Sequence, residues 1–145
     1  MKMRVLSIAV TASLLVGLAV ITANAGIFAK TVATIPFDFA TAKHTASAGT
    51  YTISETEFPG VLLLTDAQGD HGVFLFVQRH ADSKDVAKRE LVFHRYGKQY
   101  FLAQIMFGEQ RGYQLLMSPA ELEIVKSNSL AKNEQKPELV YVAAH

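Results

Sequence analysis

Histidine is the residue type in this chain best suited to bind a metal or to move a proton near neutral pH. None of the histidines stands in a His-x-His or His-Glu-x-x-His pattern, and the chain has no cysteine. A zinc site would therefore need histidines and carboxylates gathered from separate loops. The sequence therefore predicts no metal site. We expect the histidines to be exposed or hydrogen-bonded: His44, His71, His80, His94 and His145.

The polar run His94-Arg95-Tyr96 is the most distinctive candidate contact. In a strand, His94 and Tyr96 would share one face and Arg95 would take the other. One interpretation is a contact site for a small anion or a partner. The other, which we favour because no spacing rule supports the first, has Tyr96 half-buried and His94 bonded to a backbone carbonyl.

Other reactive constellations are missing from the sequence. There is no Gly-x-Ser-x-Gly elbow for a nucleophilic serine, and Gly69 and Gly72 belong to turns and not to a phosphate loop. The paired carboxylates Asp82/Asp85 and Glu121/Glu123 stand in solvated or helix-capping contexts, where we expect ordinary acidity. The sequence thus predicts no catalytic residue, no cofactor-binding residue and no cofactor, and hence no enzyme.

Residues 1–25 have the features of a signal peptide. Lys2 and Arg4 precede an uncharged, mainly apolar run that ends in Ala23-Asn24-Ala25, a small-x-small cleavage site. We expect cleavage after Ala25, and an uncleaved membrane anchor is the alternative. With no cysteine for lipid attachment, the mature protein should be exported to the periplasm or the medium without a stable membrane anchor.

The mature chain, residues 26–145, is long enough for one domain. Removing Lys2 and Arg4 from the 14 basic residues leaves 12, against 13 acidic residues, so the net charge becomes −1. The longest basic run is Lys88-Arg89. Nucleic acid is therefore excluded as an expected partner.

The predicted fold is organised around a hairpin, Leu91–Phe107, which turns at Gly97-Lys98 and has apolar residues on both faces. Gly60–Leu64 and Gly72–Phe76 repeat one pattern twelve residues apart and predict two adjacent antiparallel strands. Further strands are expected at 31–40, 50–54 and 113–117, with a loop at 79–89. Strands that are apolar on both faces need cover, so we predict a mainly antiparallel all-β fold, a small barrel or two-layer sandwich of about 7–8 strands.

One helix is predicted near the C-terminus, at about 119–132. Ser118 and Glu121 form a capping box, with Pro119 as the first helical residue. The Ser118 side chain would accept a hydrogen bond from the Glu121 N–H, and the Glu121 side chain would accept one from the Ser118 N–H. The apolar residues of this helix form no clean stripe, so we expect it to pack lightly. After Pro137, a final strand is predicted at about 138–143.

Three motifs resemble a group of small exported bacterial β-rich proteins of unassigned function. They are Ile35-Pro36-Phe37-Asp38-Phe39, Ala48-Gly49-Thr50-Tyr51-Thr52-Ile53, and Leu91–Gly97 followed by Gln99-Tyr100-Phe101-Leu102. Where such proteins have Leu-Pro before the second motif, this chain has Ala46-Ser47. The resemblance implies export and a β-rich domain, and it implies no reaction, cofactor or binding residue.

The sequence therefore favours a non-catalytic, soluble β-domain that acts as an interaction or structural module on an unknown protein or envelope component. Phe58, beside Pro59-Gly60, could be a surface contact for a partner, but we expect it to be buried under its loop. A carrier of a small apolar ligand, with an interior barrel cavity, is the second hypothesis. A hydrolase is the third.

Overall fold

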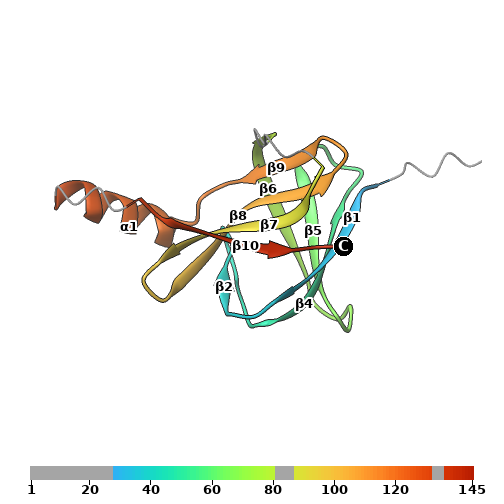
Figure 1. Ribbon diagram of the computed structural model, residues 1–145, viewed down its shortest axis with the longest axis horizontal. Helices are drawn as coiled ribbons and strands as arrows, with labels where there is room; N and C mark the ends of the chain where they lie inside the picture. Colours follow the sequence, from blue (N-terminus) through green and yellow to red (C-terminus); the bar gives the residue numbers. More distant parts are fainter. Residues whose placement is uncertain (1–27, 81–86, 132–135) are drawn as a thin grey trace, which may run out of the picture.

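The computed structural model of the chain describes residues 28–80, 87–131 and 136–145, so the predicted signal peptide and its cleavage site at Ala23 and Ala25 lie outside the described residues. The described strands are β1 (Lys30–Ile35), β2 (Phe39–Ala40), β3 (Thr45–Ala46), β4 (Gly49–Glu55), β5 (Val61–Asp66), β6 (Gly72–His80), β7 (Arg89–Tyr96), β8 (Gln99–Gly108), β9 (Arg111–Leu115) and β10 (Glu138–Ala143), and the helix is α1 (Pro119–Leu130). Figure 1 shows the helix extending away from the strands.

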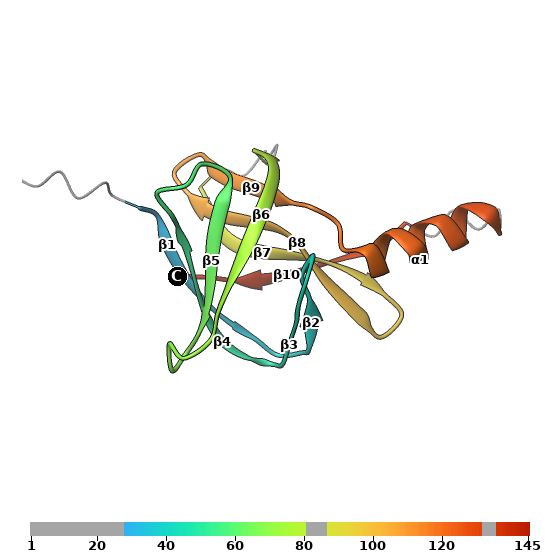
Figure 2. The same ribbon diagram turned by 180° about the vertical axis from the view of Figure 1, so that it is seen from behind.

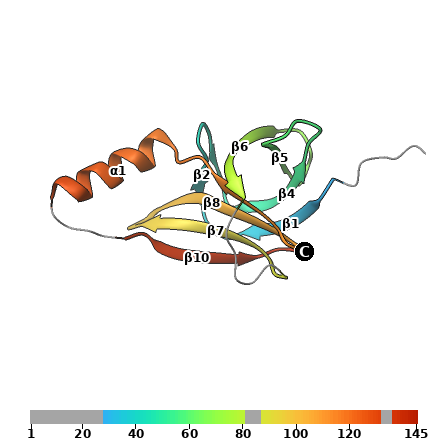
Figure 3. The ribbon, with the colours of Figure 1, turned by 90° about the horizontal axis from the view of Figure 1, so that it is seen from above.

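The strands form one mainly antiparallel sheet. Its order is β1-β4-β5-β6-β9-β8-β2-β3, and β7 pairs with both β8 and β10. The expected pairing of the two repeated segments is confirmed, because Leu62 of β5 lies opposite Leu75 of β6. Figures 2 and 3 show the sheet curling, so that β4, β5 and β6 lie across from β7 and β10.

The sheet is not closed into a barrel, so the barrel form of the prediction is wrong. β1 meets the end of β10 at a bridge between Ala33 and Ala144, flanked by two backbone hydrogen bonds between Val32 and His145 of 2.8 and 3.0 Å. β1 ends at Ile35. Pro36 follows, and because proline lacks an N–H it cannot extend a ladder.

The number of strands also differs from the expected 7–8. Pro36 divides the predicted strand 31–40 into β1 and β2, and Thr45–Ala46, which lies outside the predicted strands, pairs with β2. The helix ends at Leu130, two residues before the predicted end, and the final strand has the predicted bounds. Of the predicted loop 79–89, residues 79–80 belong to β6, residue 89 belongs to β7, and 81–86 lie outside the described residues.

The organising hairpin is confirmed as β7 and β8, which pair from Arg89–Phe107 to Tyr96–Gln99. A register shift between Val92 and Phe93 breaks the strict alternation of faces. Both residues are buried, as are Leu102, which lies opposite Phe93, and its neighbour Phe101. The hairpin is thus covered on both faces, as its apolar pattern predicts.

The core lies inside the curl of the sheet and centres on Phe93. Phe37 and Phe39 both contact its ring edge to face, at centroid distances of 5.0 and 5.5 Å, and Phe37 also stacks on Tyr100 at 3.8 Å. The other large apolar side chains that are fully buried come from β1, β4, β7 and β8: Ile35, Ile53, Leu91 and Ile105. One cluster therefore joins both halves of the sheet.

We expect Phe93→Ala to lower the free energy of unfolding by about 3–5 kcal/mol, because it empties a site that the surrounding strands cannot refill. The matched control is Phe74→Ala on β6, whose side chain is 56% exposed and whose loss should cost within about 0.5 kcal/mol. Urea denaturation followed by circular dichroism measures both. Equal losses for the two variants would contradict the assignment of the core.

Candidate functional site

Two of the three residues in the predicted polar run meet a carboxylate from the helix. His94 and Tyr96, on one face of β7 as expected, both reach Glu121 in the first turn of α1. His94 Nδ1 lies 2.6 Å from Glu121 Oε1, and the Tyr96 hydroxyl donates to the same oxygen at 3.3 Å. We call these three residues the Glu121 cluster.

The start of the helix places this carboxylate. The Ser118 side chain accepts from the Glu121 N–H at 3.0 Å, and Pro119 follows as the first helical residue. This is one of the two bonds of the predicted capping box. The Glu121 carboxylate turns inward to His94 and Tyr96 and is 2% exposed, so the expectation of a solvated or capping carboxylate is wrong. The hydrogen bonds with His94 and Tyr96 and the positive end of the helix dipole both stabilise the carboxylate in this buried position.

The Glu121 cluster holds the helix to the sheet. Glu121 is the buried residue of α1, whereas Leu122 and Leu130 are 42% and 86% exposed. The light packing expected for this helix is therefore confirmed. The prediction that His94 bonds a backbone carbonyl is wrong, because its Nδ1 is hydrogen-bonded to the Glu121 carboxylate of the helix.

Tyr96 acts here as a hydrogen-bond donor. Its pKa is raised to about 12, first by burial and then by the charge and hydrogen bond of Glu121. It is therefore protonated at neutral pH and suited to hold the carboxylate. It is not suited to accept a proton from a substrate.

Arg95 points to the other side of the hairpin, as strand alternation predicts. Its Nε donates to the Gly97 carbonyl at 2.8 Å, Nη1 lies 3.3 Å from Glu138 Oε2, and the guanidinium lies over the Tyr100 ring at 5.4 Å. The structure thus does not bring all three residues of the run together. An anion site formed by His94, Arg95 and Tyr96 has no support from this geometry.

A second carboxylate cluster, which sequence reasoning missed, joins β4 to β9. Glu55 Oε1 accepts from the Tyr113 hydroxyl at 2.6 Å, and Oε2 accepts from Arg111 Nη1 at 3.1 Å and from the Ala29 N–H at 2.9 Å. Burial, followed by the hydrogen bond and charge of Glu55, raises the pKa of Tyr113 to about 12. Glu55 and Tyr113 are 58 residues apart, so no local spacing could have linked them.

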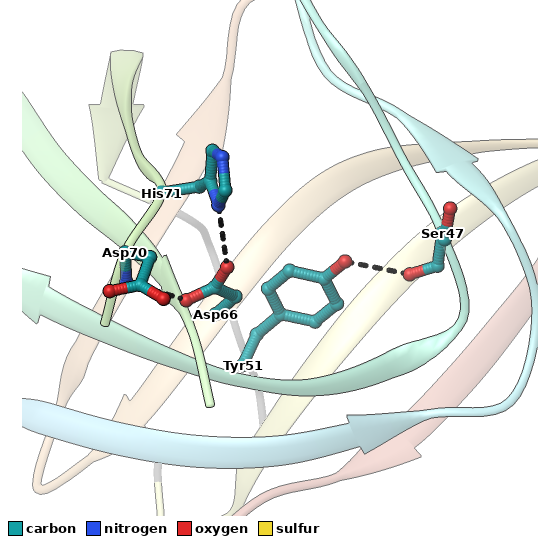
Figure 4. Close-up of polar contacts among 5 residues, drawn as sticks. All are labelled: Ser47, Tyr51, Asp66, Asp70 and His71. Atoms are coloured by element: carbon teal, nitrogen blue, oxygen red, sulfur yellow. Dashed lines mark hydrogen bonds and ion pairs between the residues drawn. The ribbon is translucent and has the colours of Figure 1, made fainter. Parts of the chain in front are cut away.

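A third polar group lies at the turn between β5 and β6 (Figure 4). Asp66 Oδ2 lies 3.1 Å from His71 Nδ1, and Oδ1 accepts from the Asp70 N–H at 3.1 Å. Beside it, the Tyr51 hydroxyl donates to the Ser47 carbonyl at 2.7 Å, and burial, then Asp66 and Asp38, raise the pKa of Tyr51. The Asp66 group fixes a turn, as its composition predicts.

None of these clusters assembles a reactive centre. Among the described residues, no three histidine, aspartate or glutamate side chains are grouped so that they could hold a metal ion. Within the same residues, no helix has the length and apolar character needed to span a bilayer.

No family model, curated protein or solved structure matches the chain.

We expect Glu121→Ala to detach the helix, because it leaves the half-buried polar groups of His94 and Tyr96 without their partner. The loss in unfolding free energy should be about 1–3 kcal/mol, and the amides of helix residues 120–130 should exchange faster. Hydrogen exchange measured by mass spectrometry resolves this segment. Glu123→Ala, on the same helix and 71% exposed, should leave exchange unchanged, and faster exchange in both variants would refute the role of the cluster.

The two tyrosines with a pKa of about 12 predict a loss of stability in alkali. The folded chain keeps these protons above the ordinary pKa of 10.0, so the free energy of unfolding should fall as pH rises from 10 to about 12. Tyrosinate absorbance should show two late ionisations. Tyr113→Phe should remove one of them, whereas Tyr141→Phe, at an exposed position, should leave both in place.

Proposed function

We propose that the protein is an exported, non-catalytic binding module of the cell envelope or extracellular space. The leader-like residues 1–25 support export. A well-filled core with an apolar outer face supports a binding role. We also propose that the two halves of the curled sheet pack face to face as two layers.

The observation that carries the proposal is an apolar patch on the outer face of β5, β6 and the end of β9. Phe74 and Phe76 alternate along β6 and are 56% and 38% exposed. Leu63 lies opposite Phe74, and Leu116, 45% exposed, donates its N–H to the Phe76 carbonyl. Exposed apolar side chains gathered on adjacent strands are typical of interaction surfaces.

The chemistry at the edge of this patch suggests the kind of partner. Lys43 Nζ lies 5.1 Å from the centre of the Phe76 ring, where its charge is attracted to the face of the ring. A protein with an apolar contact surface and a carboxylate at its margin would complement both features. We therefore propose a protein partner in the envelope.

A hydrolase is less well supported. Glu121 and Glu55 are both hydrogen-bonded to tyrosines that stay protonated at neutral pH. The Ser118 hydroxyl accepts the Glu121 N–H at the helix start, where it stabilises the backbone. These groups serve to fasten elements together, and none of them pairs a nucleophile with a base.

A carrier with an interior cavity is also less well supported. Phe93, Leu91 and Ile105 fill the inside of the curl and are fully buried. The hollows formed by described residues open at the surface, which suits a surface-binding module better than an enclosed carrier.

Crosslinking in intact cells that express the full chain, followed by immunocapture and mass spectrometry, tests this proposal. We expect Phe74→Ser with Phe76→Ser to reduce recovery of the main crosslinked protein at least tenfold, because the centre of the patch is lost. Leu130→Ser, at the 86% exposed end of the helix, is the matched control. Unchanged recovery in the double variant, or retention of the protein in the cytoplasm, would contradict the proposal.

A further inference from the structure

Two hollows lie side by side where the chain enters β1. Phe28, which is 51% exposed, lines both of them. One has a volume of about 250 Å³ and is bordered by β1, β7 and the turn between β8 and β9. The other, of about 190 Å³, is bordered by the β4–β5 connection and β6. Together their volumes fall within the range of small-molecule sites, roughly 300–1,000 Å³.

The first hollow carries a positive charge. Lys30, Arg89 and Arg111 line it, against the single carboxylate of Glu109. Arg111 pairs with Glu55, whereas Lys30 and Arg89 have no ion pair within the described parts of the chain. An Arg guanidinium has five N–H donors, so Arg111 also keeps donors beyond the one that contacts Glu55.

Gly108 allows Arg89 to lie against the floor of this hollow. Its φ of +77° favours glycine, and a Cβ at this position would stand 3.3 Å from Arg89 Cγ and 3.4 Å from the Ala87 carbonyl oxygen. A larger residue here would displace the arginine stem. The backbone therefore contributes to the position of the cation.

Apolar side chains form part of the wall of the second hollow, beside Glu55, Thr56 and Tyr113. Its walls include Phe58, which is 60% exposed, together with Val61 and Val77. The expected burial of Phe58 under its loop is wrong, and its exposed ring faces the same hollow as Phe28.

Glu55 lines the second hollow and is hydrogen-bonded to two residues that line the first, Ala29 and Arg111. Its carboxylate accepts the Tyr113 hydroxyl, the Ala29 N–H and Arg111, so its charge is compensated. Glu55 and Arg111 thus offset each other's charge, and Lys30 and Arg89 supply the positive charge of the first hollow.

We propose that the two hollows form one site for a small amphipathic anion, taken up as a free monomer with a compact carboxylate head and a linear apolar chain. The head lies between Lys30 and Arg89, and the chain passes Phe28 to reach Phe58. The site shares no residue with the apolar patch on β5 and β6, so the inference goes beyond the proposed function and stands or falls separately.

Isothermal titration of the exported protein with decanoate tests the site. We expect saturable binding, at least tenfold weaker for hexanoate, which is four methylene groups shorter. Decyltrimethylammonium, with the same chain length and the opposite charge, should bind at least tenfold more weakly than decanoate.

Variants separate the head contact from the chain contact. Lys30→Gln with Arg89→Gln should weaken decanoate binding about tenfold or more, whereas Lys98→Gln with Lys126→Gln, at two exposed cations elsewhere, should leave it unchanged. Phe58→Ser should reduce the difference between decanoate and hexanoate. Urea denaturation of each variant confirms that the fold is retained.

Three results would overturn the inference. They are equal affinity for the cationic amphiphile, unchanged decanoate affinity in the Lys30/Arg89 double variant, and binding to anionic phosphatidylglycerol vesicles without saturable binding of decanoate. Loss of the crosslinked partner in the Phe74/Phe76 variant tests the proposed function alone. The same variant should bind decanoate as the unchanged protein does.

Discussion

The burial of a hairpin that is apolar on both faces is the constraint on which this structure depends. β7 and β8 place Phe93 and Leu102 inside the curl, while Val92 and Phe101 are buried outside that cluster. A single flat sheet would leave one of these faces in water, at a cost of about 1.5–3 kcal/mol for each large side chain. The strands on either side of the hairpin must therefore bend toward each other, and the curl of the sheet follows from this need.

Polar contacts fasten the segments that apolar burial does not hold. The helix has little buried apolar surface, and Glu121 secures its first turn to β7. At the other side of the fold, Glu55 secures the residue before β1 and the start of β9. In both places a carboxylate is stabilised by a tyrosine hydroxyl and a nitrogen donor, which offsets the cost of removing its charge from water. The same solution serves two segments far apart in sequence.

Local features of the fold were predictable from the sequence, and long-range contacts were not. Alternation and turn residues gave the hairpin and the β5–β6 pair, and Ser118-Pro119 gave the start of the helix, because each signal lies within a few residues. The sequence did not predict that the Glu121 side chain turns inward, because its partners Tyr96 and His94 lie 25 and 27 residues earlier, on β7. The Glu55 cluster and the hollow beside Lys30 and Arg89 join residues whose proximity exists only after the sheet has curled. Periodicity shows that a side chain is buried, and it does not show what the side chain meets.

The bridge between Ala33 and Ala144 has a consequence for the order of folding. It joins residues 111 positions apart, so its formation must overcome the entropy of ordering nearly the whole domain. The adjacent hairpins, in contrast, can form from neighbouring residues within microseconds. We expect the first and last strands to meet late, after the transition state, which would make this seam the place where the native protein first opens under mechanical or thermal stress.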